Sequence, residues 1–460
     1  MRALVDDGHV LDSGLAAIRT QFQVPAGFSP AVEAAAAEAA RRAPTAHVDR
    51  TDQPFVTLDP ATSTDLDQAF TIEWAGDDLL LHYAIADVGW FVQPGDPLDT
   101  EAWQRGSTLY LPDGKAGLYP RSLAEGAASL LPDGPRPAVV FQVRLDAAGT
   151  ARLDGAERAL IHSRAKLAYD TVTAADLPAG FDEFSRRVAA AEAARGAGII
   201  DPPEQHVHHE GGHYRLTFRP RLPSEDQNAA MSLAANLAVA DAMQTAGVGL
   251  FRVMEAPDER AVRRLRHTAT AFGLQWPAGH SLEQFSRTLD GARPADAAFM
   301  MAARRAGGGA EYRPYEAGVV PWHAAMAATY AHATAPLRRL ADRHVVETVL
   351  AIANGNPVPE QVAAAIPELP ATMAKADRMS NTIERAVVDL AEAVILHGSE
   401  GDTFDAIVTD DDEDGTRIQL TTVAVKARVR AHGVKPGDPI RVKLVAADPV
   451  ERTVEFARVG

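Results

Sequence analysis

Residues 57–70 read TLDPATSTDLDQAF and hold three aspartates, Asp59, Asp65 and Asp67, within a short span. The flanking residues predict a strand that ends at Asp59 and a second strand that begins near Asp65. In an extended segment Asp65 and Asp67 point to one face, and a tight loop would return them beside Asp59. Carboxylates this close repel one another unless a cation lies between them. Because such oxygens suit Mg²⁺ or Mn²⁺, the stretch predicts a metal site, with ordinary turn chemistry as the alternative.

Composition sets wide limits. The chain has 460 residues, no cysteine and a formal net charge of −17. It is long enough for two or three domains. The lack of cysteine excludes disulfides and thiolate sites and suits a reducing cytoplasm. The negative charge argues against coating nucleic acid with the whole surface but leaves room for a local basic channel. No apolar run is long enough for a membrane span, so we expect a cytoplasmic globular protein with no membrane partner.

The pattern along the chain changes twice. Residues 1–48 favour helix, with Ser29 as an N-cap and Pro30 as the first helical residue. Strand-like runs follow as far as about residue 160, residues 160–200 favour helix, and residues 224–400 are mostly helical. The last sixty residues hold five short strands, which is typical of an OB-type barrel. The predicted fold class is therefore α+β.

A second stretch, YAHATAPLRRLADRHVVETVLA, covers residues 330–351. Thr334 and Pro336 mark a helix start, which would place Arg338 and Arg339 in the first turn. Free N–H groups and the helix dipole favour an anion there, and two guanidinium groups would make a phosphate site. The alternative is a pair of solvated arginines. One face of this helix should be buried; its residues are Leu337, Leu340, Ala341, His344, Val345, Thr348 and Val349.

Together the two stretches resemble the RNB catalytic domain of the exoribonuclease II family. TLDPATSTDLDQAF is similar to the family's T-[IL]-D-P-x4-D-[LM]-D-D-A motif, and YAHATAPLRRLADRH is similar to Y-x-H-x-T-S-P-[LI]-R-[RK]-[YF]-x-D. HYAIADVGWFV, GSTLYLP, KLAYDTV and MSLAANLAVA resemble further family segments in the family's order. The resemblance runs from about residue 52 to residue 396.

The resemblance implies a mixed β-sheet surrounded by helices over residues 49–397. It also implies an OB-type RNA-binding barrel over residues 398–460, behind the helical segment 1–48. The implied activity is Mg²⁺-dependent, processive 3′→5′ hydrolysis of single-stranded RNA to nucleoside 5′-monophosphates, with Mn²⁺ as a second candidate ion. The RNA would enter a channel 3′ end first, and we expect a monomer.

The resemblance also implies roles for single residues. Asp59, Asp65 and Asp67 match metal-binding acids, and Asp67 matches the acid on which the family most depends for catalysis. Arg338 matches the arginine that holds the scissile phosphate and stabilises charge in the transition state. The candidate RNA-binding residues are Tyr110, Tyr169, Arg338, Arg339 and Glu384.

The chain departs from the family at Gln68, which occupies the fourth acidic position. Glutamine can bind a metal through its carbonyl oxygen, so Gln68 remains a candidate ligand, but it brings no charge. One metal would then bind more weakly or differently. A catalytically weakened protein that binds RNA 3′ ends is therefore the alternative function. A metal-dependent phosphoesterase for small nucleotides is a further rival, which Tyr110, Tyr169 and the barrel argue against.

The region before the predicted catalytic domain also differs. Bacterial members of the family usually carry two cold-shock-type domains there, which the helix-prone residues 1–45 do not supply. With fewer groups around the channel mouth, we expect looser substrate selection and better entry of structured RNA.

A histidine cluster, HVHHEGGH, predicts a hairpin that turns at Gly211 and Gly212. Its histidines are His206, His208, His209 and His213. They suggest a transition-metal site, but we favour surface histidines because the resemblance gives this hairpin no metal.

Overall fold

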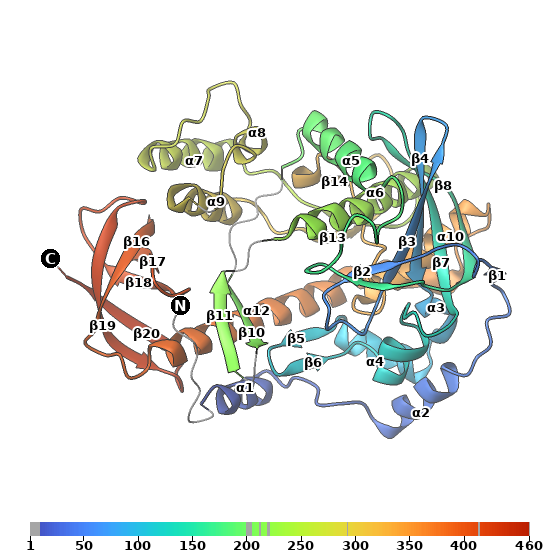
Figure 1. Ribbon diagram of the computed structural model, residues 1–460, viewed down its shortest axis with the longest axis horizontal. Helices are drawn as coiled ribbons and strands as arrows, with labels where there is room; N and C mark the ends of the chain where they lie inside the picture. The colour runs from blue at the N-terminus through green and yellow to red at the C-terminus, as the bar shows by residue number, and fades with distance from the viewer. Residues whose placement is uncertain are drawn as a thin grey trace.

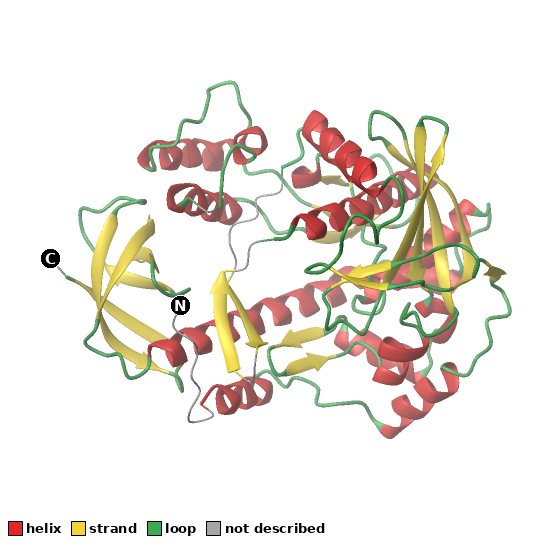
Figure 2. Cartoon of the chain, in the orientation of Figure 1, coloured by secondary structure: helices red, strands yellow, loops and turns green. Residues whose placement is uncertain are grey.

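Ten of the twenty strands in the described residues lie in two places, a five-stranded sheet and a closed five-stranded barrel, with helices between them (Figures 1 and 2). The computed structural model describes residues 10–198, 205–210, 213–218, 221–291, 293–412 and 415–459. The expected α+β class, with a barrel at the C-terminal end and helices at the N-terminal end, is confirmed. None of the helices in these ranges is both long and apolar enough to cross a membrane.

The sheet is mixed. Its order is β1 (Val48–Asp49), β8 (Ala151–Ile161), β7 (Arg136–Leu145), β4 (Asp78–Ala86) and β3 (Gln68–Ala75). The β1–β8 pair is parallel and the other pairs are antiparallel. The apolar runs of β4 and β7 are buried, as expected for strands in the centre of a sheet. Helices α6 (Pro223–Ala246) and α10 (Leu340–Ala353) pack against it.

Two small ribbons carry residues from the predicted site. Strand β2 (Thr57–Asp59) pairs in parallel with β9 (Lys166–Ala168). Strands β5 (Leu109–Leu111) and β6 (Gly114–Ala116) form a hairpin. In the region predicted as helix from residue 160 to residue 200, the described residues are helical only in α5 (Phe181–Arg195), and residues 166–168 pair with β2 instead.

The barrel closes in the order β16 (Thr403–Asp412), β17 (Gly415–Leu420), β18 (Lys426–Arg430), β20 (Thr453–Arg458) and β19 (Pro439–Asp448). The long helix α12 (Leu369–Leu396) runs from the part of the molecule that holds the five-stranded sheet to this barrel (Figure 1). One apolar core joins the barrel to α12 and to α1 (Val10–Gln21), through residues such as Leu15, Leu390 and Val442.

The N-terminal helices are packed into this architecture. Helix α2 (Pro30–Ala39) begins as predicted, with the Ser29 hydroxyl accepting from the N–H of Val32 at 3.4 Å. Helix α1 contacts α12, and Arg452 of the barrel donates to Gln21 at 2.5 Å. The predicted hairpin is also present, as β10 (Gln205–Glu210) and β11 (His213–Phe218). Its expected turn at residues 211–212 lies outside the described residues.

On β10, the rings of His206 and His208 stack with centroids 5.3 Å apart. The side chains of the other two predicted cluster members, His209 and His213, are not among those described.

A small helical module has a core of its own, around Leu265, Phe285 and Phe299. It consists of α7 (Glu259–Ala271), α8 (Leu282–Ser286) and α9 (Pro294–Ala306). The remaining elements are α3 (Val88–Phe91), α4 (Pro97–Arg105), η1 (Leu123–Ala127), β12 (Leu250–Val253), β13 (Glu311–Pro314), β14 (Trp322–His323), η2 (Ala324–Met326), β15 (Ala328–Thr329) and α11 (Glu360–Ala365).

Candidate active site

A cavity of about 780 Å³ collects most of the residues singled out by the sequence. They come from segments that are far apart along the chain. Those that line the cavity are Asp59, Asp65, Asp67, Gln68, Tyr110, Tyr169, Arg338 and Arg339. Glu384 is exposed on α12 and is not among the described lining residues, so its role stays a prediction.

Asp59 ends β2, and the pairing of β2 with β9 brings Tyr169 next to it. The N–H of Tyr169 donates to the backbone carbonyl of Asp59 at 3.3 Å. Burial raises the pKa of the Asp59 carboxyl to about 7, and the nearby Asp65 adds to the rise, while Arg338 opposes it. Asn228 of α6 fixes this corner, because its side-chain N–H groups donate to the Leu58 carbonyl and to the Tyr169 hydroxyl.

Asp65 lies in the loop before β3 and has a cationic neighbour that sequence analysis missed. The Lys115 ammonium is 2.7 Å from its carboxylate, and the Tyr110 hydroxyl donates to the same carboxylate at 3.3 Å. Tyr110 and Lys115 face each other across the β5–β6 hairpin. The Asp113-Gly114 turn signal predicts such a hairpin and so offered a way to find Lys115.

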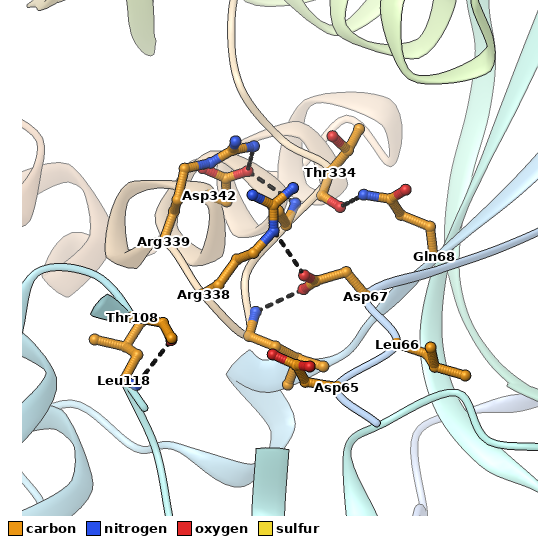
Figure 3. A network of polar contacts seen from close by, with 12 residues as sticks. Asp65, Leu66, Asp67, Gln68, Thr108, Leu118, Thr334, Arg338, Arg339 and Asp342 are labelled. Atoms are coloured by element: carbon orange, nitrogen blue, oxygen red, sulfur yellow. Dashed lines mark hydrogen bonds and ion pairs between the residues drawn. The ribbon is translucent and has the colours of Figure 1, made fainter. Parts of the chain in front are cut away.

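Asp67 is almost completely buried and is held by the segment that carries Arg338 (Figure 3). Its Oδ1 accepts from the Leu337 N–H at 2.7 Å, and its Oδ2 lies 3.4 Å from Arg338 Nε. Burial raises the pKa of Asp67 to about 7, against the attraction of Arg338. The Arg338 side chain is 43% exposed, so its guanidinium can also reach a ligand in the cavity.

Gln68 is the first residue of β3 and is bonded at both ends of its amide. Its Nε2 donates to the Thr334 carbonyl (Figure 3), and its Oε1 accepts from the Tyr83 hydroxyl at 3.1 Å. The Tyr83 hydroxyl lies 2.6 Å from that of Ser232 on α6. The expected role of Gln68 as a metal ligand stays a prediction.

The predicted helix start near Thr334 was wrong, because α10 begins at Leu340. Asp342 explains the difference. Its carboxylate accepts from the Ala335 N–H at 2.9 Å and from the Arg339 guanidinium, through Nε at 2.9 Å and Nη2 at 2.7 Å (Figure 3). These bonds hold residues 335–339 in a turn ahead of the helix. All seven residues of the predicted buried face are buried, but Leu337 lies in the turn before α10, and Asp342, Arg343 and Val346 of the helix are buried as well.

The turn after α4 connects the Tyr110 hairpin to the segment that carries Arg338. The Thr108 N–H donates to the Arg338 carbonyl at 3.0 Å, and the Leu340 N–H donates to the Gly106 carbonyl at 3.0 Å. Gly106 has a φ of +70°, and a Cβ there would lie 2.8 Å from the Cβ of Ala376 on α12. Glycine is therefore required by both backbone and packing.

The donor set fits a divalent ion. Three carboxylates face one cavity, and burial raises the pKa of two of them, a cost that a cation would relieve. Among the described residues, no three acidic, histidine or cysteine side chains form a cluster that could hold a metal ion by itself. Mg²⁺ does not need one, because it usually keeps several waters and binds through one or two carboxylates and a substrate phosphate.

Comparison with protein families assigns the chain. The RNB domain matches residues 47–354, and the RNase II-type exonuclease C-terminal S1 domain matches residues 402–459. The first match covers more than half of the chain, so the chain belongs to the RNB family. The proposed domain limits at residues 48 and 397 stay a prediction.

Individual relatives agree with this assignment. Ribonuclease R of Aquifex aeolicus is 26% identical over 456 residues, which is 89% of this chain and 64% of that protein. The chain therefore spans less than two thirds of that relative. The fold matches that of Mycoplasma genitalium RNase R in complex with ribose-methylated single-stranded RNA, with a TM-score of 0.86, 19% identity and coverage of 98% of this chain and 78% of the other.

Yeast Ssd1, described as a pseudonuclease, has the same fold with a TM-score of 0.68 and 16% identity, over 96% of this chain and 57% of that one. The fold alone therefore does not decide whether RNA is cut.

Proposed function

We propose that the chain is a 3′→5′ exoribonuclease that hydrolyses single-stranded RNA processively to nucleoside 5′-monophosphates with the help of Mg²⁺. The observation that carries this proposal is the cavity in which Asp59, Asp65 and Asp67 meet Arg338, with Tyr110 and Tyr169 on its wall. Carboxylates suit a metal, a guanidinium suits a phosphate, and aromatic rings suit bases of any identity.

Asp59, Asp65 and Asp67 would hold the ion, with Mn²⁺ as a possible substitute. When bound, it would activate a water and neutralise charge on the phosphate under attack. Arg338 binds the scissile phosphate, and its exposed guanidinium stabilises the charge that builds up there. Asp67 accepts from Leu337 and pairs with Arg338, so it also fixes the position of that guanidinium.

The walls of the cavity favour a polymer over a mononucleotide. The Tyr110 residue is 55% exposed, so its ring can stack on a base, and Tyr169 lies on another side. We also assign Arg339 and Glu384 to the RNA path, with Arg339 acting from its position against Asp342.

A second cavity, of about 350 Å³, lies where the barrel meets α9 and α12. Its lining is rich in basic side chains, although the chain has a net charge of −17. Such a lining suits the phosphate backbone of an RNA strand that leads to the first cavity. Its basic residues are Arg305, Arg417, Lys426, Arg428 and Arg452.

The proposed substrate is the single-stranded 3′ end of an RNA, and we propose that a monomer acts on it in the cytoplasm. Structured RNA with a 3′ tail would also be accepted. Cleavage of tailed duplexes that stalls well ahead of the stem would contradict this last point.

The deciding experiment incubates the protein with 5′-labelled single-stranded RNA and Mg²⁺ or Mn²⁺. A ladder that shortens from the 3′ end is expected, while a circular RNA of the same sequence stays intact. Asp67→Asn should lower the rate by roughly a hundredfold or more, the usual cost of removing a group that organises transition-state charge. Asp77→Asn, in the exposed β3–β4 turn, is the matched control and should cut normally.

RNA that is bound but left intact by the wild type with either ion would instead support the alternative, a protein that holds RNA 3′ ends without cutting them.

A further inference from the structure

The loop that carries Arg338, residues 333–339, is anchored by side chains along its length. We call it the Arg338 loop. Three of its N–H groups donate to side-chain oxygens: Ala333 to Asn236 at 2.9 Å, Ala335 to Asp342 at 2.9 Å, and Leu337 to Asp67 at 2.7 Å. All three anchors are acceptors. The Thr334 carbonyl needs the opposite partner, a donor.

Gln68 supplies that donor. Its Nε2 donates to the Thr334 carbonyl, while its Oε1 accepts from the hydroxyl of Tyr83. Tyr83 is fully buried in β4 and contacts Ser232 of α6. The amide therefore connects two strands of the sheet and α6 to the Arg338 loop.

An acidic side chain at this position would not make the same connection. A carboxylate cannot donate a hydrogen bond, so its oxygens would repel the Thr334 carbonyl unless a cation lay between them. The glutamine N–H provides this attraction without an ion. Both ends of the Gln68 amide are already bonded within the protein.

We propose that Gln68 is a positioning residue: its amide holds the Arg338 loop against the sheet, in place of a cation, and does not ligate the catalytic ion. This rests on the proposed nuclease function and assigns a role to the residue by which the chain departs from its family's acidic motif. The chain therefore needs only Asp59, Asp65 and Asp67 as ion ligands.

Metal binding is the first test, because it does not depend on activity. Mn²⁺ binding is measured by the EPR signal of the free ion, with wild type and Gln68→Met, which keeps the length of the side chain and removes both hydrogen bonds. The Mn²⁺ stoichiometry should be equal and the Kd values should agree within about threefold. A Kd that rises roughly tenfold or more would show that Gln68 takes part in binding the ion and would overturn the proposal.

Catalysis is the second test, by single-turnover cleavage at saturating Mn²⁺ and RNA. Gln68→Met should lower the rate by roughly ten- to a hundredfold, because a displaced Arg338 no longer meets the phosphate. The Kd for RNA, measured without a divalent ion, should stay within about threefold. An unchanged rate would overturn the proposal.

Gln68→Asp separates the two roles most sharply. A positioning residue predicts slower cleavage than wild type, and a ligand predicts tighter Mn²⁺ binding and faster cleavage.

Tyr83→Phe gives an independent check if Gln68→Met does not fold. It removes one hydrogen bond to Gln68 and keeps the ring, so it should slow cleavage less than Gln68→Met does, again without a change in Mn²⁺ affinity. The double variant should be no slower than Gln68→Met, since both act through one network. Additive losses would contradict the proposal.

A wild type that does not shorten RNA would refute the nuclease function, and the Mn²⁺ comparison would still decide the role of Gln68.

Discussion

Burial controls the proton equilibria of the two carboxylates, Asp59 and Asp67, that face the cavity beside Arg338. Removal from water raises the pKa of each to about 7, and Arg338 opposes that rise. Near neutral pH a proton and a divalent ion therefore compete for the same oxygens. The ion-free protein should respond to pH in a way that the ion-bound protein does not.

The direction of this response follows from linkage. A carboxyl whose pKa is raised by folding favours the folded state when protonated, so stability falls as pH rises from about 4 to about 7. An ion that binds the ionised form offsets the loss. Mn²⁺ should therefore raise the Tm more at about pH 8 than at about pH 6.

Thermal unfolding with and without Mn²⁺ at the two pH values tests this. The double variant Asp59→Asn/Asp67→Asn is the control, and in it the Mn²⁺-induced Tm shift should be the same at both pH values. An equal Tm shift at both pH values in the wild type would contradict the prediction.

At the residue scale, sequence motifs identified the three aspartates and Arg338 because these residue types recur at recognisable spacing. Lys115 and Asn228 escaped notice for a physical reason. A lysine in a three-residue strand and an asparagine in an alanine-rich helix have no periodic signal, and their partners, Asp65 and Tyr169, are set by tertiary contacts.

At the scale of elements, the turn at Gly106 couples three parts of the site. It ends α4, accepts a hydrogen bond from Leu340 at the start of α10, and lies against Ala376 of α12. Two residues later, Thr108 donates to the Arg338 carbonyl. The positions of the Tyr110 hairpin and of Arg338 therefore depend on one turn.

Gly106→Ala should destabilise the protein by at least about 1–3 kcal/mol, the cost of a positive φ for a residue with a Cβ, and the contact with Ala376 adds to it. Gly95→Ala is the matched control: its φ is +79°, but a Cβ there meets nothing within 4 Å. Urea unfolding measures both, and an equal loss in the two variants would show that packing against α12 does not matter.

Local signals predicted the strands beside Asp59 and Asp65, the β10–β11 hairpin and the barrel strands, but they misplaced the start of α10. Pro336 and Thr334 are ordinary helix-start residues, and sequence rules favour them. The structure begins the helix at Leu340, because the Asp342 carboxylate binds the Ala335 N–H and the Arg339 guanidinium and so stabilises a turn. Helix propensities do not predict that the side chain of Asp342, inside the helix, will bind residues that precede the helix start.

At the scale of the whole molecule, one buried carboxylate joins the barrel to the rest. Glu392 of α12 is 5% exposed and accepts from the Lys426 N–H at 2.7 Å and from Gln205 of the β10–β11 hairpin. Burial raises its pKa to about 8, although both donors favour the ionised form. Barrel, hairpin and helix meet at this group.

The raised pKa means that the folded state holds the proton, so Glu392 makes the wild type less stable as pH rises from about 4.5 to about 8. Glu392→Gln cannot ionise, and it should lose less stability than the wild type between about pH 6 and about pH 9. Denaturant unfolding at both pH values measures this. Glu451→Gln, on an exposed barrel turn, should keep the wild-type dependence, and a Glu392→Gln variant that also keeps it would contradict the prediction.

The overall architecture was predictable to different extents. Five short strands near the C-terminal end indicated a closed barrel, and the alternation of runs indicated the α+β class. The packing of α1 into the barrel core was not predicted, because the apolar face of a 12-residue helix does not specify its partner. Residues such as Leu11 and Ile18 are buried in the core that α1 shares with α12 and the barrel, and the sequence alone does not identify these partners.

The length of α12 has a geometric consequence. Its 28 residues form a continuous rod of about 42 Å that contacts the hairpin β5–β6 region, α1 and the barrel. In such a rod, the number of residues in the helix sets both the orientation of the barrel about the helix axis and its distance from the sheet. A single inserted residue would turn the barrel by about 100° about the helix axis, whereas seven would return it to nearly the same heading some 10 Å further away. The direction in which the barrel faces is thus a matter of helical phase.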